Sequence, residues 1–160
     1  MVVPMNPESF MMRAIELARH GMTRGDGGPF GAVVVRGGEI IGEGWNRVLA
    51  TNDPTAHGEV TAIRDACAKA ETFDLSGSEI FTTGEPCPMC LGAIYWARIV
   101  SVRYGFSIVD AARVGFDDRE FYRQIGLPPG ERSVPATPLC RDEALRLAAD
   151  YIAMPGRRIY

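Results

Sequence analysis

The sequence lacks any long apolar run, and no segment approaches the roughly 20 residues that a membrane-spanning helix needs. Its start has no basic stretch followed by an apolar one, so no secretory signal is expected. Lysine is nearly absent: Lys69 is the only one, and the arginines are spread along the chain. With a net charge of -3 and no basic stripe, a nucleic-acid partner is disfavoured. We therefore expect a cytoplasmic protein that does not contact membranes.

Histidine and cysteine are also scarce, with two histidines and four cysteines in 160 residues. A disulfide framework is not expected in a cytoplasmic protein. Cys67 falls on the apolar face of a predicted helix and is assigned to the core. Cys140 precedes a later helix and has no evident partner in the sequence. The closely spaced Cys87 and Cys90 are the pair that requires a chemical explanation.

The remaining pattern alternates between helical and β-rich segments. Asn6 and Pro7 are typical of a helix start, and Gly37–Gly38 joins two β-rich runs as a hairpin. A strand, a helix and a strand between residues 78 and 106 imply a right-handed parallel crossover. A mixed sheet with helices on both faces follows. We expect helices over residues 7–21, 57–70, 87–98 and 141–154, strands over 32–36, 39–45, 78–84 and 99–106, short helices within 107–126, and an edge strand near Val134.

The motif "EPCPMC" predicts a metal-binding helix start. With Pro88 at the first helical position, Cys87 becomes the N-cap, and Cys90 lies on the same face. The positive end of the helix dipole favours thiolate there. Two thiolates on one face can share a metal ion.

His57 is the candidate for a third ligand. Start signals at residues 53–55 place it at the beginning of a helix, and helix starts can open at the same edge of a sheet. Three protein ligands leave the fourth zinc position to water, which is typical of a catalytic site and lowers the pKa of that water to about 7. Glu59, two residues on, does not share the helix face of His57 and can instead move protons.

Each part of this pattern has a plainer explanation on its own. His57 could be a structural histidine, and Cys87 with Cys90 could be a redox pair or half of a structural zinc site. A non-catalytic zinc- or redox-binding module is therefore the alternative from a different class. Together, however, His-x-Glu followed by Pro-Cys-x-x-Cys is the signature of zinc nucleobase deaminases. A proton-carrying Glu59 also argues for catalysis.

From about Met5 to Tyr160 the chain resembles the cytidine deaminase superfamily, and within it the bacterial-type guanine deaminases. The resemblance is carried by "GGPFGAVVV", "NDPTAHGEVTAIR", "EPCPMCLGAIYWAR", "GFDD" and the terminal tyrosine. It implies an α/β fold, a three-layer α/β/α sandwich around a five-stranded mixed sheet, as one domain over residues 1–160. It also implies one Zn²⁺ per chain with water as fourth ligand, and hydrolysis of guanine to xanthine and ammonia in purine catabolism or salvage.

The same resemblance implies roles for further residues. Glu59 would protonate the ring nitrogen and assist loss of ammonia, with Asp118 as a second proton shuttle. Asn46 would hydrogen-bond the base, and Phe30 and Trp96 would form apolar walls. Each keeps a structural alternative: a turn residue for Asn46, a helix cap for Asp118, core packing for Phe30, and core or dimer burial for Trp96.

The resemblance further implies a homodimer in which residues 140–160 cross to the partner, so that Tyr160 closes the neighbouring pocket, although it could also be a disordered end. Two positions depart from the usual pattern: Gly58 replaces an alanine, and Gly84 a cysteine or serine. Alternative substrates are cytosine, guanosine, tRNA adenosine and aminotriazines such as ammeline. Aspartate at position 118 favours guanine, and the acidic balance disfavours tRNA.

Overall fold

The computed structural model describes residues 6–160, whose contacts divide into two compact units with a boundary between Arg119 and Glu120. The first unit contains every strand of the described residues and every residue that lines the cavity of the candidate site. The second contains most of α6 (Arg119–Ile125), a short 3-10 turn (Pro129–Glu131) and α7 (Arg141–Ala153). A single domain over 1–160 stays a prediction.

The first unit is built on a mixed sheet with the strand order β2-β1-β3-β4. Strand β1 is antiparallel to both neighbours, whereas β3 and β4 are parallel, as the predicted crossover requires. Gly37 and Gly38 form the predicted hairpin with φ angles of 61° and 83°, a region that favours glycine. The strands are β1 (Gly31–Arg36), β2 (Glu39–Trp45), β3 (Ser78–Gly84) and β4 (Ser101–Phe106).

The expectation of a five-stranded sheet is wrong for the described residues, which form four strands. The edge strand expected near Val134 is absent, and Val134 lies in a bend with 81% of its surface exposed. Four prolines between residues 128 and 138 remove N–H donors that a strand would need, which accounts for the difference.

The helices begin where the sequence indicates. In α1 the side chain of Asn6 accepts a hydrogen bond from Ser9 N at 2.8 Å. The helix runs past Gly21 to Arg24, because Gly25 is the residue that adopts the left-handed conformation at the C-cap. A short α2 lies between the expected strand 39–45 and the expected helix 57–70, where no element was expected. The helices of this unit are α1 (Pro7–Arg24), α2 (Val48–Thr51), α3 (Gly58–Ala70), α4 (Pro88–Trp96) and α5 (Ile108–Arg113).

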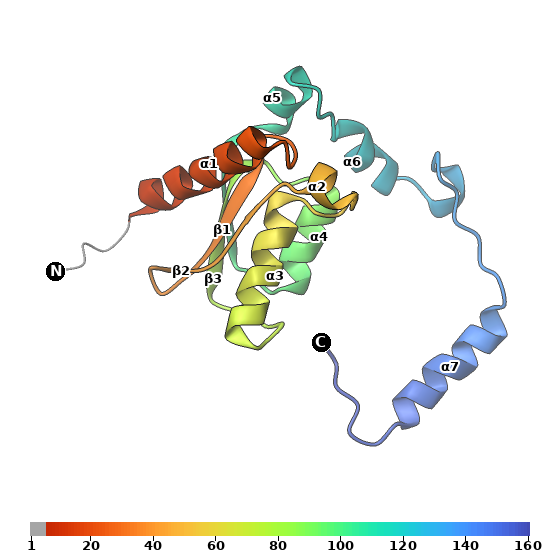
Figure 1. Ribbon diagram of the computed structural model, residues 1–160. Coiled ribbons are helices and arrows are strands. Elements are labelled where there is room, and N and C mark those ends of the chain that lie inside the picture. The colour runs from red at the N-terminus through yellow and green to blue at the C-terminus, as the bar shows by residue number, and fades with distance from the viewer. Residues whose placement is uncertain (1–5) are drawn as a thin grey trace. The chain divides into compact units, whose positions relative to one another are not determined.

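Two clusters of buried side chains hold the layers together. Phe10 and Leu17 of α1 pack with Val33 and Phe81 on one sheet face. On the other face, residues of α3 and α4 pack against Ala32, Val34 and Ile80. Figure 1 shows α1 on one side of the sheet and α3 with α4 on the other, which confirms the three-layer arrangement. Cys67 packs against the second cluster, as assigned.

This arrangement brings two helix starts together. Cys87 is the N-cap of α4 with Pro88 at its first position, as predicted, and His57 is the N-cap of α3. Both residues line one cavity. Within residues 6–160 no helix is long and apolar enough to cross a membrane.

Candidate active site

The three predicted metal ligands converge at the starts of α3 and α4. His57 Nδ1 lies 3.6 Å from Cys87 Sγ and 3.5 Å from Cys90 Sγ. All three ligand atoms lie within 4.8 Å of one another. A tetrahedral zinc ion with its usual bonds to nitrogen and sulfur would separate these atoms by about 3.6 Å. The donor set and its spacing therefore fit zinc.

The electrostatics of this triangle favour a cation. The pKa of the Cys87 thiol is lowered to about 4, first by a hydrogen bond from the Cys90 thiol and then by the His57 ring. The pKa of Cys90 is raised because its proton is held by Cys87 and because it is buried. The pKa of His57 is raised, chiefly by its hydrogen bond with Cys87. A metal ion would displace the proton that these groups share.

Glu59 lies in the first turn of α3 with only 4% of its surface exposed. It lines the same cavity as His57 and Cys87. Burial raises the pKa of its carboxyl group above the ordinary value, with the charge of Cys87 acting in the same direction. A carboxyl group with a raised pKa can both accept and donate a proton near neutral pH. The site thus places three atoms that could hold a metal ion in the same cavity as a buried carboxyl group with a raised pKa.

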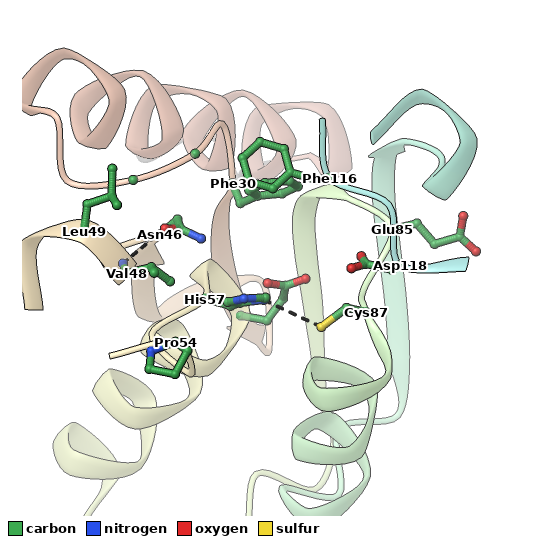
Figure 2. A pocket seen from close by; sticks show the side chains of 13 residues that line it. Phe30, Asn46, Val48, Leu49, Pro54, His57, Glu85, Cys87, Phe116 and Asp118 are labelled. Atoms are coloured by element: carbon green, nitrogen blue, oxygen red, sulfur yellow. Dashed lines mark hydrogen bonds between the residues drawn. The ribbon is translucent and has the colours of Figure 1, made fainter. Parts of the chain in front are cut away.

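The cavity has a volume of about 410 Å³, which lies within the range of small-molecule sites. Figure 2 shows the His57 ring directed at Cys87, with Phe30 and Phe116 on another wall. The lining combines apolar side chains with a few polar groups. Its residues are Gly27, Gly28, Phe30, Asn46, Val48, Leu49, Pro54, His57, Glu59, Glu85, Cys87, Phe116 and Asp118.

Three of the residues expected to contact substrate line this cavity: Phe30, Asn46 and Asp118. Burial raises the pKa of Asp118, and the negative charge of Cys87 adds to the effect. Trp96 is not a lining residue of this cavity; it is the last residue of α4, at the opposite end from Cys87, and is 69% exposed. Tyr160 belongs to the second unit. The roles of all five residues stay predictions.

Sequence reasoning missed several lining residues. Phe116 packs edge-on against Phe30, with ring centroids 4.9 Å apart at 90°. Glu85 donates its backbone N–H to Phe106 O, and its carboxylate accepts from Ile108 N, both at 2.9 Å. The signals were present, because Phe116 is part of "GFDD" and Glu85 begins "EPCPMC". Val48 and Leu49 lie between the expected strand 39–45 and the expected helix 57–70, and Pro54 was interpreted only as part of a helix-start signal.

Gly58 also has a steric role. A Cβ atom built there would lie 2.9 Å from the carbonyl oxygen of Phe30, closer than side chains approach in practice. The start of α3 and the strand that follows Phe30 therefore pack together through a glycine.

Comparisons with known proteins agree with this geometry. Residues 4–106 match the model of the cytidine and deoxycytidylate deaminase zinc-binding region, so the chain belongs to that family. Within the family, it is 53% identical to the guanine deaminase of Bacillus subtilis, over 82% of this chain and 84% of the relative. A crystal structure of guanine deaminase from that species matches with a TM-score of 0.93, covering 98% of this chain and 99% of that chain at 47% identity.

A tRNA-specific adenosine deaminase from Haemophilus influenzae is 36% identical over 77% of this chain and 74% of that relative. The family thus includes relatives that act on different bases.

Proposed function

We propose that this protein hydrolyses guanine to xanthine and ammonia at a zinc site held by His57, Cys87 and Cys90. The observation that carries the proposal is the triangle of ligand atoms beside the buried Glu59, in a cavity of suitable size for one base. The similarity to the Bacillus guanine deaminase supports guanine as the substrate. Cys87 and Cys90 must be reduced to bind zinc, which agrees with the predicted cytoplasmic location.

The reaction consumes one water and releases one ammonia. Zinc, one per chain with water as its fourth ligand, would supply an acidified water and a Lewis acid. Glu59 takes a proton from the attacking water, whose oxygen bonds to C2 of the base. Glu59 then delivers that proton to the ring nitrogen. It next transfers the remaining proton of the new C2 hydroxyl group to the amino group, which leaves as ammonia while the C2 carbonyl forms, as its burial and raised pKa allow.

The other lining residues would hold the base. Asn46 offers an amide, and Phe30 with Phe116 offers an apolar wall. Asp118 lies in the same lining and would act as the second proton shuttle at the guanine edge. Its raised pKa suits a group that exchanges protons near neutral pH. Trp96, at the far end of α4, would serve as a wall residue in the site of a partner chain.

The first experiment measures ammonia release by the zinc-loaded protein on a panel of guanine, guanosine, cytosine, cytidine, adenine, an aminotriazine and a tRNA anticodon stem-loop. Guanine turnover well above the others supports the proposal. Turnover of another compound with guanine untouched would keep the zinc chemistry and reject guanine. No turnover with zinc bound would favour the non-catalytic module.

The second experiment replaces Glu59 by glutamine. We expect Glu59→Gln to lower kcat by at least about 100-fold, because it removes the acid–base group while leaving the ligands intact. Zinc content, measured by atomic absorption, should stay near one per chain. Glu71→Gln makes the same change at the exposed C-cap of the same helix and should leave kcat unchanged. Full activity in Glu59→Gln would contradict the mechanism.

We also propose a homodimer in which residues 140–160 cross to the partner and Tyr160 closes its pocket. This rests on the family resemblance and on the exposure of the segment: every residue from 133 to 160 is exposed. Light scattering should give twice the mass of the chain. A monomer at all concentrations would contradict the exchange of this segment.

A further inference from the structure

We propose that Asp26 is a positioning residue that fixes Asn46 and α2 at the base-binding side of the cavity. The proposal rests on the proposed function, because it assumes that Asn46 holds the base. Asp26 follows the C-cap of α1 and precedes Gly27 and Gly28, which line the cavity. It is only 7% exposed, although it is an aspartate in a loop. A buried carboxylate normally has a set of specific partners.

The partners of Asp26 come from three elements. Its carboxylate accepts a hydrogen bond from Trp45 Nε1 at 2.8 Å, at the end of β2, and one from Arg24 Nε at 3.3 Å. Its carbonyl oxygen accepts from the backbone N–H groups of Leu49 and Ala50 in α2, at 3.0 and 3.1 Å. Its own N–H donates to a carbonyl of α1. One residue thus ties α1, β2 and α2 together.

Trp45 transmits this constraint to the next residue, Asn46. The indole ring lies edge-on to His20, with centroids 4.9 Å apart. It also lies so close to Gly21 that a Cβ there would be 2.4 Å from the ring. With its Nε1 bonded to Asp26, the ring has packing on one side and a charged acceptor on the other. The backbone at the end of β2 is therefore held in one position.

Asn46 is fixed on its other sides by groups that Asp26 orders. Its side-chain oxygen accepts from Val48 N at 3.2 Å, in α2. A Cβ at Gly27 would lie 1.9 Å from that oxygen, so the amide packs directly on the loop beside Asp26. Figure 2 shows the amide nitrogen on the side of Asn46 away from Val48. Asp26 therefore governs which face of the amide is offered to the cavity.

The test uses the full-length, zinc-loaded protein and four variants: Asp26→Ala, Asp26→Asn, Trp45→Phe, and the double variant that combines Asp26→Ala with Trp45→Phe. We expect Asp26→Ala to raise KM for guanine about 10-fold, as expected for losing a hydrogen bond to a charged group that shapes binding. Its kcat should stay within about 3-fold, because His57 and Glu59 are untouched. Trp45→Phe should raise KM similarly. The KM of the double variant should be no higher than that of the more strongly affected single variant, because both changes remove the same interaction. Asp26→Asn should recover most of the affinity, since its Oδ1 can still accept from Trp45.

Hydrogen exchange over residues 46–51 gives a readout that needs no turnover. Exchange there should rise in Asp26→Ala and Trp45→Phe and stay low in Asp26→Asn. The matched control is Asp74→Ala, which removes an aspartate from a turn outside the cavity and should leave KM and this exchange unchanged. Both readouts are collected at equal zinc content.

Unchanged KM and unchanged exchange in Asp26→Ala would overturn the proposal and leave the guanine reaction intact. A fall in kcat and stability with KM unchanged would also overturn it, since that indicates a structural role only. If Asp26→Ala fails to fold, Trp45→Phe decides by the same criteria. If the wild-type chain does not turn over guanine, the proposed function fails. The hydrogen-exchange measurement would still show whether Asp26 orders residues 46–51.

Discussion

The two units of this chain use similar helices in different surroundings. In the first unit, β1 is almost wholly buried, and α1 and α3 cover its two faces. In the second unit, α7 carries Leu145, Ala148 and Ile152 at helical spacing, yet no described residue from 120 to 160 is buried. Helical periodicity therefore predicts an element in both units, but only the first supplies a sheet on which the apolar face can pack.

The helix ends differ in the same way. Asn6 caps α1 with a side-chain hydrogen bond, whereas Cys140 at the start of α7 makes none and has a φ of 49°. Burying a leucine or isoleucine contributes about 1.5–3 kcal/mol, so the apolar face of α7 gains stability only against a covering surface. The proposed partner subunit would provide that surface.

Zinc removal should produce the largest difference in stability between the two units. Chelation is expected to lower the free energy of unfolding of the first unit by about 4 kcal/mol when zinc had been present at about 1,000 times its dissociation constant. Hydrogen exchange should rise at the starts of α3 and α4 and change little in α7. Calorimetry with and without chelator, followed by zinc addition, measures the effect. An equal loss of protection from hydrogen exchange in α7 would contradict the expected difference between the two units.

A matched pair of isoleucines gives the next largest effect. Ile80→Val removes a methylene from the core, where the side chain is fully buried, and should lower the free energy of unfolding by about 1 kcal/mol. Ile152→Val makes the same change in α7, at a side chain 64% exposed, and should have almost no effect in dilute protein. Urea titrations measure both. A substantial effect of Ile152→Val that grows with protein concentration would instead reveal a covering partner.

The smallest effect concerns ion pairs. Arg13 of α1 makes a two-pronged contact with Glu43 of β2, at 2.7 and 3.1 Å, which lowers the pKa of Glu43. Its stabilisation is therefore present above the unfolded-state pKa and lost as pH falls through the folded-state pKa. Glu43→Gln should cost up to about 1 kcal/mol at pH 7 and nothing in strong acid.

Glu143→Gln is the control for that pair, because Glu143 contacts Arg146 within the exposed α7. We expect no measurable change at either pH, since exposed pairs within one helix contribute little. A cost for Glu143→Gln equal to that for Glu43→Gln would mean that the position of a pair in the fold is irrelevant.

Much of the first unit was predictable because its signals are local. Caps, the Gly37–Gly38 turn and the Cys87–Pro88 helix start depend on neighbouring residues only. The parallel crossover then followed from general topology, and with it the meeting of His57 and the cysteines. By contrast, Phe116 and the aromatic packing of Phe30 depend on contacts between distant segments, which a pattern of residues does not encode. The edge strand expected near Val134 is absent from the described residues because the nearby prolines lack the N–H donors that a strand needs.

The glycine between His57 and Glu59 has a wider consequence. With alanine at this position, one methyl group would stand between the start of α3 and the backbone of Phe30; here the two surfaces touch directly. The distance across the cavity from the aromatic wall to the metal ligands is thus set in part by a missing side chain. A Cβ atom at Gly58 would lie 2.9 Å from the carbonyl oxygen of Phe30, so Gly58→Ala is expected to force the two backbones apart. A position outside the cavity lining therefore helps to set the width of the cavity.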